Sequence, residues 1–192
     1  MIRSALGLLA GLTLALGAGA AHGKECKGVA FPDQVQADGA ALKLNGLGLR
    51  QATFLRIDVY VGALYLAQPS RDADAILKAN GPWQLVLHFV RDVGQADLVK
   101  AWDEGFENNA KGEIPALKDR IESFKGMMAD VKTGERIVMT YKPGAGVQTA
   151  VKGTAKGAIA GEDFARALLA IWLGPRPPNA DLKAGLLGGP CG

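Results

Sequence analysis

The clearest alternation of apolar and polar residues covers residues 53–66. The odd positions from Leu55 to Ala63 are apolar, whereas the even positions Arg56, Asp58 and Tyr60 carry polar atoms. A period of two with one apolar face predicts a half-buried strand. A simple two-layer core does not require two charges and a phenol on the other face. That face is therefore the first candidate for a functional surface.

A glycine-spaced segment leads into this predicted strand, with Gly46 and Gly48 followed by Arg50. The dipeptide Asn45-Gly46 is a turn signal, although the two glycines equally indicate a bulge or a close backbone approach.

The remaining periodicity predicts an α+β domain with one mainly antiparallel sheet, because strands come early and late, with helices between and after them. Predicted strands cover 83–90, 135–141 and 146–152, with an ambiguous third short strand within 152–161. Predicted helices cover 71–80, 95–110, 114–128, 163–173 and 180–187.

The first 23 residues differ from the rest of the 192-residue chain. Arg3 is followed by an apolar run rich in Gly and Ala, with small-residue cleavage candidates at 18–20 and 21–23. This pattern favours a secretory signal peptide over a retained anchor. We expect residues 24–192 to form a single exported domain, periplasmic or secreted, with no transmembrane segment.

Charge and cysteine content narrow the function further. Residues 1–23 hold one of the 22 Lys and Arg residues and none of the 19 acidic residues, which leaves a net charge of +2. That charge is too weak to indicate nucleic-acid binding. Cys26 and Cys191 lie at opposite ends of the mature chain and predict a disulfide; two free thiols on frayed ends are the alternative. Their spacing excludes a CxxC redox motif and a cysteine metal site.

Catalytic and cofactor motifs are missing from the sequence. His88 is the one histidine after residue 23 and lies in a predicted strand, so we expect a polar or solvent-facing side chain rather than a general base. The chain has no G-x-S-x-G motif, phosphate loop or dinucleotide fingerprint. We therefore expect neither cofactor nor metal. Trp83, Trp102 and Trp172 fall on apolar faces, where core packing is the expected role.

The polar residues that remain are Arg50, Arg56, Asp58 and Tyr60. An arginine fork beside a phenol suits a carboxylate, since both groups donate hydrogen bonds to it. An ordinary Arg56–Asp58 ion pair on a solvated strand face is the alternative, and the residues alone leave both open.

The strings LNGLGLR at 44–50 and DVYVGALYL at 58–66 resemble the signature of the chalcone isomerase fold family, with weaker similarity over about 28–187. The resemblance implies an open-faced sandwich, in which helices pack on one side of a large antiparallel sheet. Arg50 matches the arginine of the true isomerases, but Tyr60 stands at their threonine position. Their helix tyrosine and asparagine fall within 97–105, which has neither, although Asn108 and Asn109 follow; their late hydroxyl falls near Ile171. These departures argue against flavanone-forming activity.

Tyr60 in place of threonine is similar to the fatty-acid-binding, non-catalytic members. The resemblance implies that Arg50 and Tyr60 hold the ligand carboxylate, while apolar helix faces around Trp102 and Phe106 line the acyl tail. A turn near Ala52 would leave Tyr60 about five residues, roughly 17 Å, from the partner of Arg50, with Arg56 the nearer cation.

Two other functions stay open: an enzyme that uses Arg50 on an unknown small substrate, and a structural or partner-binding envelope protein with a filled cleft. No particular protein partner is indicated. An apolar tunnel ending at Arg50 and Tyr60 would favour ligand binding.

Overall fold

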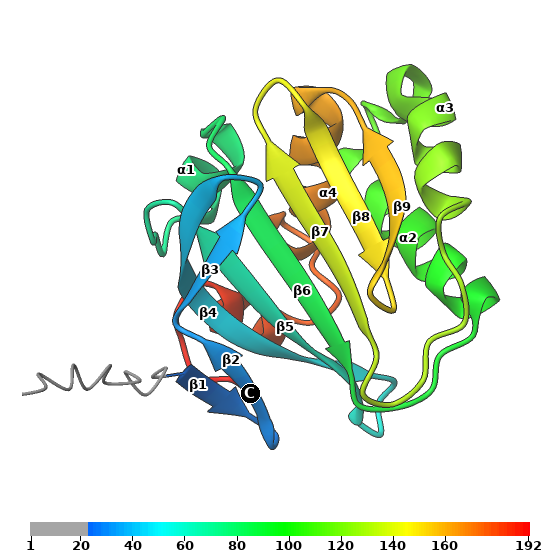
Figure 1. The fold of residues 1–192 in the computed structure, drawn as a ribbon. Coiled ribbons are helices and arrows are strands. Elements are labelled where there is room, and N and C mark those ends of the chain that lie inside the picture. Colours follow the sequence, from blue (N-terminus) through cyan, green and yellow to red (C-terminus); the bar gives the residue numbers. More distant parts are fainter. Residues whose placement is uncertain (1–22) are drawn as a thin grey trace, which may run out of the picture.

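The computed structural model describes residues 23–192, so the predicted signal peptide lies outside the described residues except for Gly23. Seven strands, β3 to β9, form one antiparallel sheet in sequence order, and β1 pairs separately with β2 (Figure 1). The strands are β1 Gly23–Cys26, β2 Val29–Pro32, β3 Gln34–Ala37, β4 Ala40–Ala52, β5 Ile57–Leu66, β6 Trp83–Phe89, β7 Arg136–Lys142, β8 Gly146–Val151 and β9 Thr154–Ile159. The helices are α1 Ala73–Lys78, α2 Gln95–Ala110, α3 Ile114–Lys125, α4 Glu162–Leu173 and α5 Ala180–Leu186.

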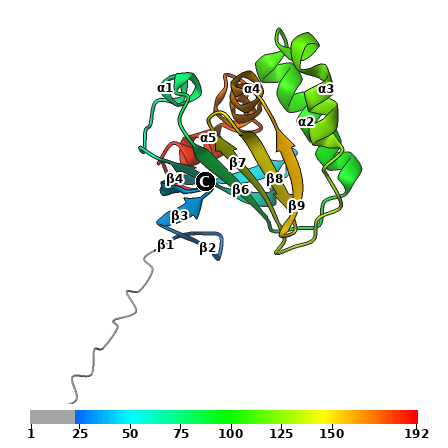
Figure 2. The same cartoon turned by 45° about the horizontal axis from the view of Figure 1, so that its top comes forward.

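The curled sheet has a core on each face. Helices α2, α3 and α4 lie on one side, and the β1–β2 pair lies on the other (Figure 2). Nine of the twelve residues of α4 are buried, as expected for a helix that is apolar around most of its surface. The predicted α+β architecture is therefore confirmed, and Trp83, Trp102 and Trp172 are core residues as expected.

The predicted strand over 53–66 is wrong at its start. Residues 53–56 form a turn, in which the Arg56 amide donates to the Thr53 carbonyl oxygen at 3.2 Å, and β5 begins only at Ile57. Thr53 and Arg56 have φ angles of +60° and +51°, outside the strand region. The longest strand is β4, which has 13 residues.

The glycine-spaced segment is a continuous part of β4, so the interpretation of Asn45-Gly46 as a turn is wrong. A register shift between Leu44 and Gly46 marks a bulge, and the backbone of α5 lies against the two glycines. A Cβ at Gly48 would overlap the Leu182 carbonyl oxygen. Asn45 fixes this contact by donating to the Leu186 carbonyl oxygen at 2.8 Å. The alternative interpretation of the two glycines is confirmed, because a bulge and a close backbone approach are both present.

The two ends of the described chain are joined. Cys26 and Cys191 form a disulfide, the pairing that their positions predicted, and Cys26 is buried with Phe31 and Leu49 in the core beneath the sheet. Within residues 23–192, no helix has the length and apolarity needed to cross a membrane.

Candidate functional site

Arg50 and Tyr60 are direct cross-strand partners in the β4–β5 ladder. Directly opposed residues of an antiparallel pair have Cα atoms roughly 5 Å apart and side chains on the same face. The expected 17 Å offset is therefore wrong. It assumed a turn near Ala52, whereas the turn lies at residues 53–56 and a register shift follows Arg50.

Tyr60 points from β5 into the core between the sheet and the helices. Its side chain is only 9% exposed, and its hydroxyl oxygen accepts a hydrogen bond of 2.9 Å from Nε1 of Trp172 in α4. Burial raises the pKa of Tyr60 to about 12, although the Trp172 bond and the Arg50 charge oppose that rise. The hydroxyl thus stays protonated and can still donate its own hydrogen. Apolar periodicity predicted a core role for Trp172 and could not reveal this bond.

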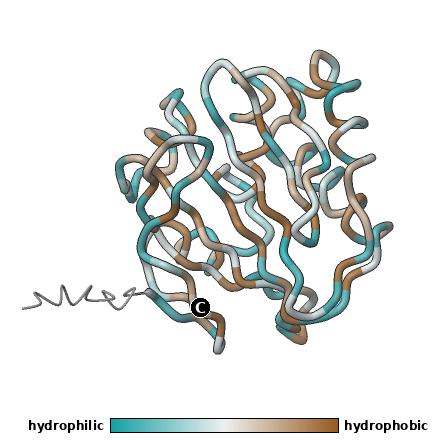
Figure 3. Tube along the Cα trace, in the orientation of Figure 1, coloured by the Kyte–Doolittle hydropathy of each residue, from teal (hydrophilic) through white to brown (hydrophobic). Residues whose placement is uncertain are grey.

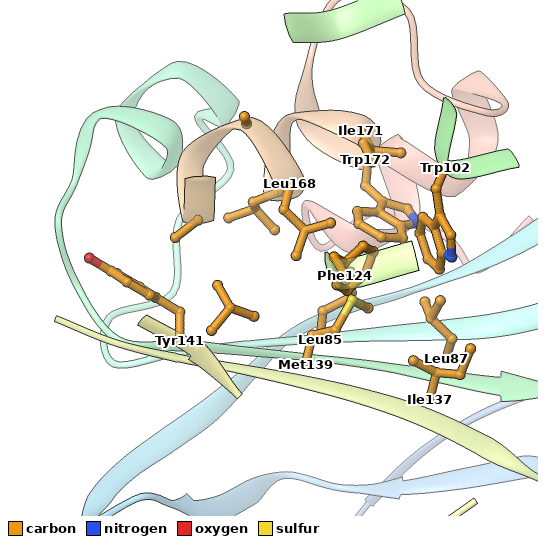
Figure 4. Packing of buried hydrophobic residues seen from close by; sticks show 14 of the residues in the cluster. Leu85, Leu87, Trp102, Phe124, Ile137, Met139, Tyr141, Leu168, Ile171 and Trp172 are labelled. Carbon is orange, nitrogen blue, oxygen red and sulfur yellow. The ribbon is translucent and has the colours of Figure 1, made fainter. Parts of the chain in front are cut away.

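Trp102 carries a further buried donor and packs on Trp172. Its ring packs edge-on against Trp172 with centroids 5.5 Å apart, and Figure 4 shows the two indoles side by side above the sheet. The Trp102 Nε1 atom is buried without a hydrogen-bond partner in the described part of the chain. An unpaired buried N–H costs about 1–3 kcal/mol. Arg50 and Tyr60 therefore bring two hydrogen-bond donors to one place on the sheet, as an anion requires.

Apolar side chains pack closely around Tyr60. Phe89 packs on the Tyr60 ring with centroids 5.6 Å apart, and Phe106 is fully buried in the same cluster. Two hollows lie elsewhere: one of about 310 Å³ on the outer face of β7–β9, and a water-sized one between α1 and α4. Neither is lined by Arg50 or Tyr60, so neither is the expected tunnel.

Arg56 and Asp58 do not form the surface pair that was the alternative to a carboxylate site. Arg56 lies in the turn and bonds to Asp181 of α5 at 3.0 Å, whereas Asp58 pairs with Lys27 at 3.4 Å. Arg56 is also not the nearer cation to Tyr60, because Arg50 stands directly opposite it.

Asn109, just after the positions that match the isomerase helix residues, and Ile171, near the late hydroxyl position, both have structural contacts here. Asn109 donates to the Arg176 carbonyl oxygen at 2.9 Å and so ties α2 to the segment after α4. Ile171 is buried, and its side chain fills the space in front of Gly105.

His88 accepts a hydrogen bond of 2.9 Å from Arg136 and is partly exposed, as expected for a polar strand residue. The described residues contain no cluster of His, Cys, Asp and Glu able to hold a metal ion.

Comparison with known proteins agrees with the fold. The crystal structure of a fatty-acid binding protein from Arabidopsis thaliana is similar to this chain, with a TM-score of 0.64 and 18% identity. The match covers 83% of this chain and 92% of that one, and at this identity it shows the fold. The search of curated proteins found no match. The family model described as chalcone isomerase-like matches residues 23–188. This chain therefore belongs to the chalcone isomerase-like family, as its resemblance predicted.

Proposed function

We propose that the protein binds a fatty acid or a similar amphipathic carboxylate, with Arg50 and Tyr60 holding the head group. The observation that carries this proposal is the direct opposition of Arg50 and Tyr60 in the β4–β5 ladder. A guanidinium and a protonated phenol both donate to a carboxylate. Trp102, which packs on Trp172, carries a further buried donor in the same core. A fold shared with a protein described as fatty-acid binding supports the same ligand class.

The acyl tail has to enter the packed layer between the sheet and helices α2 and α4. Each methylene buried there contributes about 0.8 kcal/mol, and Trp102 and Phe106 would be among its contacts. Because this layer is filled, entry requires the side chains of the core to move apart. The same filled layer is the observation that favours the second candidate, a structural or partner-binding envelope protein with no ligand.

Titration with palmitate, followed by native mass spectrometry and calorimetry, tests the proposal. Arg50→Gln removes a charge-assisted interaction worth about 1.5–3 kcal/mol, so the affinity should fall about 10-fold to 100-fold. Tyr60→Phe removes a neutral donor and should weaken binding by up to about tenfold. Arg56→Gln is the matched control on the same hairpin and should bind like the native protein, because Arg56 bonds to Asp181. Failure of the native protein to take up palmitate would favour the second candidate.

The affinity should also be insensitive to pH between neutrality and about 10, the ordinary pKa of tyrosine. Burial raises the pKa of Tyr60 to about 12, so the hydroxyl remains a donor across that range and is lost only as the pH approaches the raised value. Calorimetric titrations at several pH values, with circular dichroism to confirm folding, provide the measurement. A decline centred near pH 10 would contradict a buried phenol as the head-group donor.

We further propose that residues 24–192 act as a single domain in the periplasm after removal of residues 1–23. The disulfide between Cys26 and Cys191 supports an oxidising compartment. The Gly- and Ala-rich apolar start of the sequence supports export. The intact mass of the protein isolated from cells tests this, and a mass that includes the first 23 residues would refute it.

A further inference from the structure

The turn between β4 and β5 presents large apolar side chains to solvent. Phe54 is 92% exposed and Leu55 66%, and Ile57, which begins β5, is 37% exposed. Within residues 23–192 these are the only large hydrophobic side chains with such exposure. The turn projects from the lower edge of the sheet in Figure 1, and Figure 3 colours the same place hydrophobic.

Specific contacts hold this turn in place. Gln51 donates from Nε2 to the Arg56 carbonyl oxygen at 3.2 Å and accepts from Arg56 Nε at 2.8 Å. The amide of Leu55 donates to Thr53 Oγ1 at 3.3 Å. The Arg56 bond to Asp181 braces the turn against α5. Thr53 and Arg56 both adopt the left-handed region, which is uncommon for residues with a Cβ. The outward direction of Phe54 and Leu55 is therefore built into the turn.

We propose that this turn docks the protein on an anionic phospholipid surface by inserting Phe54 and Leu55 among the lipid chains. A stable protein interface buries about 800 Å² on each partner, far more than three side chains on one turn can supply. A bilayer needs no such area, because each inserted side chain gains its transfer free energy separately.

The charges at the base of the turn fit anionic head groups. Lys27, Arg50 and Arg56 lie at this base. Asp58 pairs with Lys27 and Asp181 pairs with Arg56, which leaves the positive charge of Arg50 in excess. Within residues 23–192, Arg50 has no carboxylate partner at ion-pair distance. Cations beside an exposed apolar pair suit the interface between head groups and lipid chains.

The inserted side chains Phe54 and Leu55 lie outside the proposed ligand site, although Arg50 belongs to both, and docking does not depend on a bound fatty acid. The two are nevertheless close, since the turn joins the strands that carry Arg50 and Tyr60. A protein docked through this turn would hold that end of the β4–β5 ladder at the lipid surface.

Co-sedimentation of the mature protein with vesicles tests the docking proposal. Vesicles that contain phosphatidylglycerol should retain the native protein more strongly than pure phosphatidylcholine vesicles. Phe54→Ser combined with Leu55→Ser should lower partitioning about 100-fold, since burying either side chain is worth about tenfold or more. Phe54→Leu, which keeps an apolar tip, should retain most of the binding. Arg56→Gln should reduce it only on anionic vesicles.

Several results would overturn the proposal. One is a native protein that stays in the supernatant at every lipid concentration, and another is a double variant that binds like the native protein. A protein partner lost in the double variant, without vesicle binding by the native protein, would assign the turn to protein recognition instead. The ligand site is tested separately: Tyr60→Phe should leave vesicle binding unchanged, and the Phe54→Ser, Leu55→Ser variant should bind palmitate in solution as before.

Discussion

Alanine at Gly46 is expected to lower the free energy of unfolding by about 3 kcal/mol, at the upper end of typical overpacking costs. The added Cβ would overlap the Gly185 carbonyl oxygen and lie 2.7 Å from both the Leu186 oxygen and the Gly188 nitrogen. All three are backbone atoms, which cannot rotate away as a side chain can. Helix α5 must therefore move away from β4. That movement disturbs the packing of Leu182 and Leu186, two residues of α5 that are fully buried. Urea unfolding monitored by tryptophan fluorescence provides the measurement.

Gly81→Ala is the matched control for that substitution. A Cβ at Gly81 has no neighbouring atom within 4 Å, and its φ is not in the left-handed region. The free energy of unfolding should change by about 0.5 kcal/mol or less, or rise slightly because the unfolded chain loses freedom. Equal urea midpoints for Gly46→Ala and Gly81→Ala would show that the contact of α5 with β4 contributes little to stability.

Removal of the disulfide is expected to have the second large effect. Cys26 and Cys191 are separated by 165 positions, and loop-closure entropy assigns a crosslink of that span about 5 kcal/mol. The Cys26→Ser, Cys191→Ser variant should therefore lose about 2–5 kcal/mol of unfolding free energy, the usual range for native disulfides. Urea unfolding of the native protein with and without dithiothreitol provides a second measurement.

The double serine variant also serves as the control for reduction. Dithiothreitol should leave its urea midpoint unchanged, because residues 23–192 contain no other cysteine. If the reduced and oxidised native proteins unfold at the same urea concentration, the crosslink does not restrict the unfolded chain as loop-closure entropy requires.

Hydrophobic periodicity predicted the elements whose pattern directly reflects one buried face. Helix α2 has the predicted bounds, 95–110, because Leu98, Trp102 and Phe106 recur every four residues and all pack on the core. The start of β5 was not predictable in this way. Leu55 and Ile57 continue the apolar alternation of the strand, yet they lie exposed at the turn and the strand start. A periodic pattern records which residues are apolar and cannot show which of them face solvent.

The two main residues of the candidate site could be named from the family resemblance, but their geometry could not. The register that opposes Arg50 and Tyr60 depends on the bulge after Arg50 and on a turn held by Gln51. The bond from Trp172 to Tyr60 joins residues 112 positions apart. Such contacts form only when distant elements meet, so no local spacing in the sequence reveals them.

The contact between α5 and β4 has a consequence for how the chain completes its folding. From β3 to β9, each strand pairs with the next one in sequence. The sheet can therefore form progressively from the N-terminal strands onward. Strand β4 is finished at Ala52, yet its glycine face is covered only when residues 180–186 arrive. Likewise, the disulfide of Cys26 can form only once Cys191 is present. A chain truncated before α5 would therefore keep an uncovered strand face and a free thiol. The native structure is complete only after the last residues have packed.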